Sequence, residues 1–150
     1  LQFIKHYVTA IAKFEQFKYP LWGNVARRYG VVPIDRSNVN KAIRSLKLVE
    51  KEIIDNKISF LIAPEGTRSE DGSLGEFKKG AFHIAKNTGI SVVPVIINGA
   101  YEAKKKTDWR LSPGIIDICF TDIITQDFYS DMSVGQLRDY VRQKIKDFVD

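Results

Sequence analysis

Apolar residues recur at two different spacings along the chain, and these spacings predict alternating helices and strands. From residue 39 to residue 53 they recur every three or four positions with charged residues between them, as in an amphipathic helix that covers a sheet. Related patterns predict helices at 20–29, at 77–88 and from 134 onwards. Short apolar runs predict strands at 31–34, 58–63, 91–97 and 115–121.

Residues that begin or end helices support these boundaries. Ser37, Asn38 or Asn40 can cap the helix that starts near residue 39, because a short polar side chain accepts a hydrogen bond from the first turn. Ser133 is placed to cap the last helix in the same way. Gly89 follows the helix at 77–88 and is suited to a left-handed stop.

The order of the elements predicts the fold class. Strands that alternate with helices are typical of an α/β fold. No clear helix separates the strands at 91–97 and 115–121, so a mixed sheet is favoured over a purely parallel one. Pro94 lacks a ladder donor and is expected at an edge or a bulge. We therefore expect an α/β fold with a mixed, mostly parallel sheet flanked by helices, in a single domain over 1–150.

Composition and charge narrow the possible functions. The 150 residues are 44% hydrophobic and 27% charged, which suits a globular domain with a sizeable core. The single cysteine, Cys119, lies in an apolar run and is interpreted as a core residue rather than a nucleophile. The net charge of +5 favours anionic partners, such as nucleic acid, anionic lipid head groups or phosphorylated metabolites. No stretch approaches the roughly 20 apolar residues that span a bilayer.

Two basic regions leave alternatives open. The first 22 residues interleave aromatic side chains with lysines, which fits either a surface at the membrane interface or core packing with exposed lysine ends. The triplet at 104–106 is interpreted as a solvated loop in preference to a binding patch. Because the basic residues do not form a stripe interleaved with exposed aromatic residues, we expect no nucleic-acid partner.

Polar residues at the ends of predicted strands and at a helix start indicate a phosphate site. Arg36 follows the strand at 31–34, and Arg68 follows the strand at 58–63. Ligands of open α/β sheets bind at such strand ends, and arginine is well shaped to grip a phosphate. Lys78 and Lys79 open the next helix, where anions are favoured. These four cations are expected around one phosphate, with Glu65 either fixing an arginine or accepting a substrate hydroxyl.

Four stretches, taken in order, resemble the motifs of one enzyme family. They are Ile-Asp-Arg at 34–36, Pro-Glu-Gly-Thr-Arg-Ser at 64–69, the Gly-x-Leu-x-x-Phe-Lys-Lys-Gly stretch at 72–80, and Val-Pro-Val-Ile at 93–96. On these motifs, and on the segment at 17–23 that precedes them, the chain resembles the glycerolipid acyltransferases. It is most similar to the 1-acylglycerol-3-phosphate, or lysophosphatidic acid, acyltransferases, over about residues 7–102.

The resemblance implies a reaction and a set of substrate-binding residues. A fatty acyl group would pass from acyl-CoA or acyl carrier protein to the free hydroxyl of a lysophospholipid at a membrane surface, giving phosphatidic acid, without a cofactor or metal. A membrane-associated protein at the cytoplasmic face is expected. The residues that the resemblance and the strand ends mark for substrate binding are Arg36, Glu65, Gly66, Thr67, Arg68, Lys78 and Lys79.

The chain departs from the family at its catalytic motif. In that family a His-x-x-x-x-Asp pair transfers the proton, but Ile11 follows His6 at this spacing and Thr88 follows His83. We interpret His83 as structural and expect the base upstream of Leu1, in an N-terminally truncated chain that is inactive alone. The alternatives are a catalytically inactive lipid- or phosphate-binding relic and an enzyme for another lysophospholipid. An unrelated nucleotide-binding protein is disfavoured, because the sequence has no phosphate-binding glycine loop of the usual kinds.

Overall fold

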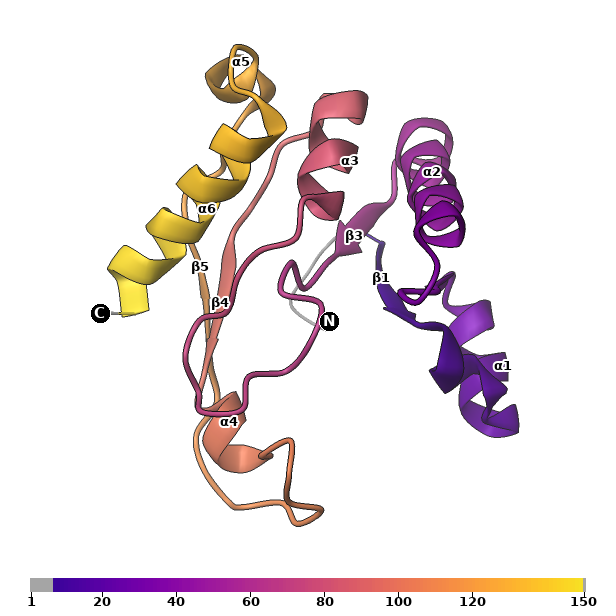
Figure 1. Cartoon of the computed structure of the whole chain (residues 1–150), viewed down its shortest axis with the longest axis vertical. Helices are drawn as coiled ribbons and strands as arrows, with labels where there is room; N and C mark the ends of the chain where they lie inside the picture. The colour runs from indigo at the N-terminus through magenta and orange to yellow at the C-terminus, as the bar shows by residue number, and fades with distance from the viewer. Residues whose placement is uncertain (1–6, 150) are drawn as a thin grey trace. The chain divides into compact units, whose positions relative to one another are not determined.

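A computed structural model describes residues 7–149 of the chain and contains two compact units, Leu1–Ile62 and Ala63–Asp150. Each unit has its own sheet and its own helices (Figure 1). The first contains a parallel sheet and the second an antiparallel pair, so the predicted α/β class with parallel and antiparallel strands is confirmed.

The first unit is built on a three-stranded parallel sheet. Its elements in chain order are β1 (Val8–Lys13), the 3-10 helix η1 (Phe14–Lys18), α1 (Pro20–Arg28), β2 (Val32–Ile34), α2 (Val39–Asn56) and β3 (Ser59–Leu61). The strand order is β2-β1-β3, with Ile11 opposite Val32 and Val8 opposite Ser59. Parallel strands bring their carboxyl ends to one edge, so Lys13 and Ile34 lie side by side where β1 and β2 end.

The central strand, β1, is the strand that the hydrophobic pattern missed. Its residues are mostly small or β-branched, and the aromatic residues around it dominate the local pattern. Thr9 in this strand is buried, and its hydroxyl donates a hydrogen bond to the carbonyl of Tyr29 at 2.7 Å. This bond satisfies a polar group that would otherwise be costly to bury beneath the turn after α1.

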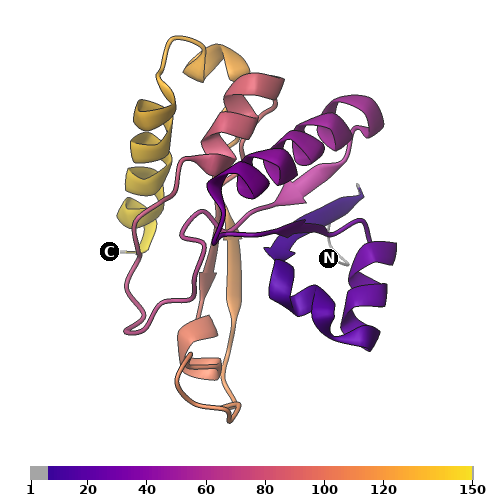
Figure 2. The same cartoon turned by 45° about the vertical axis from the view of Figure 1, so that its right-hand side comes forward.

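The long helix α2 covers this sheet as its spacing predicted (Figure 2). Val49 and Ile53 are its buried apolar residues, and it packs against β2 and β3. Of the three candidate caps, the structure selects Asn38, whose side chain accepts from the N–H of Lys41 at 3.0 Å. The helix ends at Asn56 and is followed by Lys57, a left-handed C-cap residue with φ of 53°.

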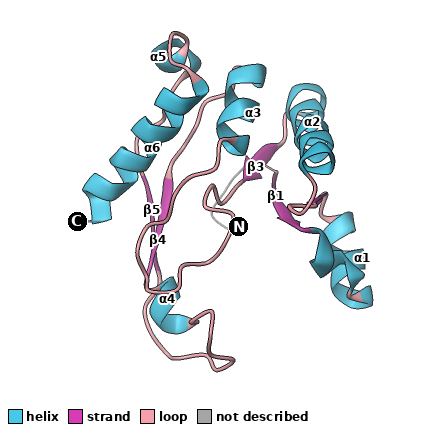
Figure 3. Cartoon of the chain, in the orientation of Figure 1, coloured by secondary structure: helices cyan, strands magenta, loops and turns pink. Residues whose placement is uncertain are grey.

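The second unit begins with a long loop and then combines helices with an antiparallel pair of strands (Figure 3). Its elements are α3 (Gly80–Thr88), β4 (Val95–Asn98), α4 (Ala100–Ala103), β5 (Asp117–Phe120), α5 (Gln126–Tyr129) and α6 (Val134–Val149). Val95 pairs with Phe120, and Ile97 pairs with Ile118. Pro94 lies immediately before β4, where its missing N–H breaks no ladder bond.

The core of the second unit lies where α3, α6 and one face of the strand pair meet. Phe82, Leu137 and Ile96 are among its buried members, and Cys119 packs against them partly buried. This position agrees with the interpretation of Cys119 as a packing residue. The neighbouring Ile118 and Phe120 are more than half exposed, so the apolar run at 115–121 is not buried throughout.

Two predicted helix boundaries of this unit are confirmed and one is wrong. Gly89 ends α3 in the left-handed conformation with φ of 67°. Ser133 and Gln136 cap α6 reciprocally, since each backbone N–H donates to the side chain of the other residue. Helix α3 begins at Gly80, not at residue 77 as predicted, because Lys78 donates its N–H to the carbonyl of Pro64 at 2.9 Å and stays in the loop.

Candidate functional site

The loop at 63–79 opens with a tight turn that requires glycine. The N–H of Gly66 donates to the carbonyl of Ala63 at 3.1 Å, and Gly66 has φ of 72°. Side chains other than glycine are strained at this φ. A Cβ at position 66 would lie 3.4 Å from both Cδ and Nζ of Lys78. The structure therefore places Gly66 beside Lys78, two of the residues that the sequence marked for substrate binding.

Glu65 holds the two ends of the loop together. Its Oε2 accepts a hydrogen bond from the N–H of Gly75 at 2.8 Å. A Cβ at position 75 would lie 2.6 Å from the same oxygen, so glycine there allows the close approach. The observed partner of Glu65 is thus a backbone amide, not one of the arginines that the sequence suggested.

Arg142 fixes the same part of the loop from helix α6. Its Nε donates to the carbonyl of Gly75 at 3.0 Å, and its Nη2 donates to the carbonyl of Leu74 at 3.1 Å. Gly75 is therefore bound through its N–H by Glu65 and through its carbonyl by Arg142. No local sequence pattern indicates this contact, because Arg142 lies 67 residues away from Gly75.

A hydrogen-bonded cluster around Asp71 shapes the tip of the loop. One carboxylate oxygen of Asp71 accepts from the N–H of Ser73 at 2.9 Å, from the hydroxyl of Ser73 at 2.6 Å and from the hydroxyl of Ser69 at 3.0 Å. The two bonds from Ser73 are the main cause that lowers the pKa of Asp71 to about 2. Ser69 also accepts from the N–H of Gly72 at 2.9 Å, so the last residue of the 64–69 motif serves the loop itself.

Arg68 faces an open hollow on this loop. The hollow has a volume of about 270 Å³, and its charged lining consists of two cations and four carboxylates: Arg68, Lys106, Glu65, Glu70, Asp71 and Glu76. Arg68 is exposed, and its guanidinium has no hydrogen-bond or ion-pair partner within residues 7–149. Lys106 is bound to Glu70 at 2.6 Å. Arg68 is therefore the guanidinium at the hollow that is available to an anion.

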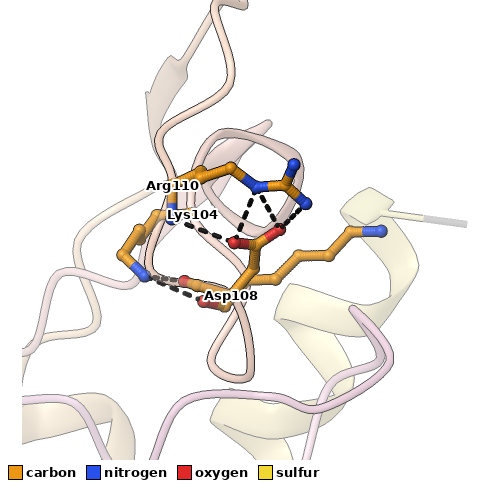
Figure 4. Close-up of polar contacts among 4 residues, drawn as sticks. Lys104, Asp108 and Arg110 are labelled. Carbon is orange, nitrogen blue, oxygen red and sulfur yellow. Dashed lines mark hydrogen bonds and ion pairs between the residues drawn. The ribbon is translucent and has the colours of Figure 1, made fainter.

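The basic triplet at 104–106 is used to fold its own part of the chain. The ammonium of Lys104 donates to the carbonyls of Lys105 and Asp108, and the guanidinium of Arg110 binds the carboxylate of Asp108 (Figure 4). Lys105 lies over the ring of Tyr101 at 5.7 Å. These contacts agree with the interpretation of the triplet as a loop rather than a binding patch.

Lys79 lies at the start of α3, apart from the hollow. Its carbonyl accepts from the N–H groups of Phe82 and His83, and its side chain is exposed. No side chain caps α3, and no acidic residue lies in its first turn. The start of this helix is therefore electrostatically suited to an anion, although Lys79 does not line the same hollow as Arg68.

Arg36 belongs to the first unit and leaves the carboxyl end of β2. Its neighbour Asp35 accepts from the N–H of Ser37 at 3.0 Å, from the hydroxyl of Ser37 at 2.6 Å and from Lys41 at 3.4 Å. The bonds from Ser37 are the main cause that lowers the pKa of Asp35. Asp35 therefore stabilises the turn into α2, and Arg36 stays exposed beside it.

The two histidines leave the catalytic base unassigned. His6 lies outside the described residues. His83 is exposed on α3, one turn after Lys79. Within residues 7–149, no three histidine, cysteine or acidic side chains gather as metal ligands would. None of the helices in that range is long and apolar enough to cross a membrane.

A comparison with protein families decides the classification of the chain. The family model described as Acyltransferase matches residues 2–98, which include Arg36, the loop with Glu65 and Arg68, and the start of α3. The chain belongs to the acyltransferase family. The resemblance drawn from the motifs is thereby confirmed, and the family's matched region contains every residue that the sequence marked for substrate binding.

Individual relatives carry related names. A 1-acyl-sn-glycerol-3-phosphate acyltransferase of Limnanthes douglasii is 37% identical over 134 residues, which are 89% of this chain and 47% of the relative. One of Cocos nucifera is 36% identical over 127 residues, 85% of this chain and 41% of the relative. A chloroplastic one of Arabidopsis thaliana is 42% identical over 89 residues, 59% of this chain and 25% of the relative.

A solved structure of this acyltransferase family is also similar. The crystal structure of the 1-acyl-sn-glycerophosphate acyltransferase PlsC from Thermotoga maritima covers 95% of this chain and 56% of that chain, with a TM-score of 0.79 and 30% identity. The matches thus span between 25% and 56% of the length of these relatives.

Proposed function

We propose that this chain is the acceptor-binding part of an enzyme that acylates 1-acylglycerol 3-phosphate to phosphatidic acid. The observation that carries the proposal is Arg68, an exposed guanidinium without a partner in the described chain, on a loop held by Glu65 and Arg142. A planar guanidinium can bind two oxygens of a phosphate monoester at once. The relatives named for this acceptor support the choice of substrate.

The proposed roles follow from the positions of the side chains. Arg68 binds the acceptor phosphate, and Thr67 lines the same hollow. Lys78, beside Gly66, and Lys79, at the start of α3, supply positive charge near the loop. Arg36, exposed in the first unit, is proposed separately as a phosphate-binding residue. Glu65 is proposed to act mainly by holding the loop, because its Oε2 is already bound to Gly75.

The chemistry needs one more group than these residues supply. The free hydroxyl of the acceptor attacks the thioester carbonyl of acyl-CoA or acyl carrier protein, the carbon–sulfur bond breaks, and the thiol leaves with a proton. A base must take the proton of the hydroxyl during the attack. We assign no such base within residues 7–149, and we expect the 150 residues alone to bind the acceptor without acylating it.

The proposed setting is the membrane in which the acceptor and product reside. Lysophosphatidic acid and phosphatidic acid both carry acyl chains, so the enzyme would work at a lipid surface, on its cytoplasmic face. The net charge of +5 is in keeping with attraction to such an anionic surface.

The test is a product analysis with the protein made from its complete reading frame. Labelled acyl-CoA and acyl carrier protein are offered with lysophosphatidic acid, glycerol 3-phosphate, lysophosphatidylcholine and monoacylglycerol in turn. The proposal predicts labelled phosphatidic acid as the main product. Acylation of another acceptor in preference to lysophosphatidic acid would refute the substrate, and phosphate-dependent lipid binding without acyl transfer would favour the inactive relic.

A further inference from the structure

Helix α1 presents its large apolar residues to solvent and its small residues to the protein. Gly23 and Ala26 are its buried residues, whereas Leu21 is 83% exposed and Trp22 is 52% exposed. A surface helix of a globular protein normally does the opposite and buries its large apolar side chains. The reversed orientation needs a physical explanation.

The contacts of α1 fix this orientation. A Cβ at Gly23 would overlap the carbonyl oxygen of Phe17, so the glycine allows α1 to lie directly on η1. Phe17 supplies the large buried side chain of this region, and the ring lies beneath the guanidinium of Arg27 at 5.7 Å. With the small face packed on η1, the other face of α1 must point outwards.

The exposed side chains form one continuous face, which we call the α1 face. Leu21, Val25 and Tyr29 follow one another at intervals of four residues, and Trp22 lies beside them on the same side of the helix. All four are exposed, as is Tyr19 just before the helix. A continuous apolar face that is exposed to solvent is typical of a binding surface.

The charges around the α1 face indicate what it binds. Lys18 precedes the helix, and Arg28 lies within its last turn. No acidic residue occurs between positions 16 and 34. Tryptophan and tyrosine favour the boundary between lipid tails and head groups, and basic residues beside them bind anionic head groups. Only basic residues flank the α1 face. Nothing in the described residues indicates a protein as the partner of this face.

We propose that the α1 face docks the protein on an anionic lipid bilayer, with Leu21 and Trp22 entering the interface. This inference refines the membrane setting of the proposed function and rests on it for its biological role. Helix α1 follows η1, which begins directly after the carboxyl end of β1. Arg36 follows β2 at the same edge, so the α1 face and this arginine belong to the same unit.

The first experiment compares two leucines of the same unit. Leu21→Glu places a charge on the α1 face, and Leu48→Glu places the same charge on α2, where Leu48 is exposed between charged neighbours such as Arg44 and Lys51. Binding of the 150-residue chain is measured by flotation with phosphatidylcholine vesicles, with and without phosphatidylglycerol. Leu21→Glu should lower partition by about tenfold or more, because a leucine side chain no longer enters the interface. Leu48→Glu should leave it unchanged.

Basic residues are tested in the same assay. Lys18→Gln and Arg28→Gln should each weaken binding to the anionic vesicles roughly fivefold and should have little effect on binding to the neutral ones. Unchanged binding of Leu21→Glu, or an equal loss for Leu48→Glu, would overturn the proposal.

A spectroscopic measurement keeps the test independent of any failure of the variants to fold. The chain has two tryptophans, so Trp109→Phe leaves Trp22 as the only indole. The proposal predicts a blue shift of Trp22 emission on vesicle addition, quenching by brominated lipid, and free access of acrylamide beforehand. A Trp22 already shielded without lipid would show that a second copy or another segment covers the α1 face, and the proposal would fail.

The outcome can be separated from the fate of the proposed function. Vesicle binding and Trp22 emission require no acyl transfer, so both can support docking in a protein that proves inactive. If the complete protein is active, Leu21→Glu should reduce acylation of vesicle-embedded lysophosphatidic acid but spare a short-chain acceptor dispersed as monomers. Equal loss on both acceptors would contradict docking as the role of α1.

Discussion

Replacing Arg142 with alanine should destabilise the second unit by about 2 kcal/mol. The guanidinium donates two hydrogen bonds to loop carbonyls, at 3.0 and 3.1 Å, from a half-buried position. A hydrogen bond from a charged donor contributes about 1.5–3 kcal/mol when buried, and solvent near Arg142 reduces each to about 1 kcal/mol. Arg142→Lys should lose about half as much, because one ammonium on a flexible stem cannot reproduce the planar fork.

The control for this prediction lies one turn earlier on the same helix. Arg138 is also half-buried, but within the described part of the chain its side chain binds only the adjacent Asp139, at 2.8 Å. Arg138→Ala should therefore change the free energy of unfolding by less than about 0.5 kcal/mol. Urea unfolding measures these differences for all three variants. Hydrogen exchange at the N–H of Gly75, which donates to Glu65, should be faster in Arg142→Ala, because Arg142 and Glu65 hold the same residue of the loop.

The reasoning would be refuted if Arg142→Ala and Arg138→Ala had the same stability. The claim that Arg142 holds the loop would be refuted if Arg142→Ala destabilised the unit but left hydrogen exchange at the N–H of Gly75 unchanged. In that case Arg142 would stabilise the core without holding the loop.

Two further predictions concern the same loop. Gly75→Ala should be less stable in urea unfolding than Gly114→Ala by about 1 kcal/mol. The new Cβ at position 75 displaces the Glu65 oxygen, whereas a Cβ at position 114 meets no described atom within 4 Å. Equal stabilities of the two variants would contradict the role of Glu65. Since the folded pKa of Asp71 is lowered to about 2 from 3.8, its stabilising effect is present above about pH 4 and is lost as the pH falls towards 2. The difference in melting temperature between the wild type and Asp71→Asn should accordingly shrink over that interval, and a constant difference would contradict the cluster.

Local patterns predicted much of the fold because caps and periodic apolar positions act over a few residues. Asn38, Ser133 and Gly89 each lie where a helix begins or ends. The strand β1 escaped prediction because a central strand between two parallel neighbours is recognised by its pairing, and its small residues leave a weak pattern. Helix α3 begins later than its apolar spacing suggests, since the bond from Lys78 to Pro64 depends on a turn far back in the chain.

The sequence marked candidate site residues, whose role stays a prediction, but it did not indicate their contacts. The motif at 64–69 pointed to Glu65, Gly66 and Arg68, and the structure adds that a Cβ at position 66 would lie 3.4 Å from the side chain of Lys78. The hydrogen bonds of Glu65 and Arg142 to Gly75 depend on where the loop meets α6. No local sequence pattern indicates that position. The membership of Arg36 in the phosphate site remains a prediction.

The central claim is that Arg68 binds the phosphate of the acceptor, and acceptor discrimination tests it most directly. The values of kcat/KM for lysophosphatidic acid and for monoacylglycerol are compared in the complete protein carrying Arg68→Ala, with Arg110→Ala, an exposed arginine bound to Asp108, as the control. Loss of a bidentate phosphate contact worth about 2–3 kcal/mol predicts a decrease of roughly 30- to 150-fold for lysophosphatidic acid, with monoacylglycerol and the Arg110→Ala control little affected. An equal decrease for both acceptors, or none for lysophosphatidic acid, would contradict the account.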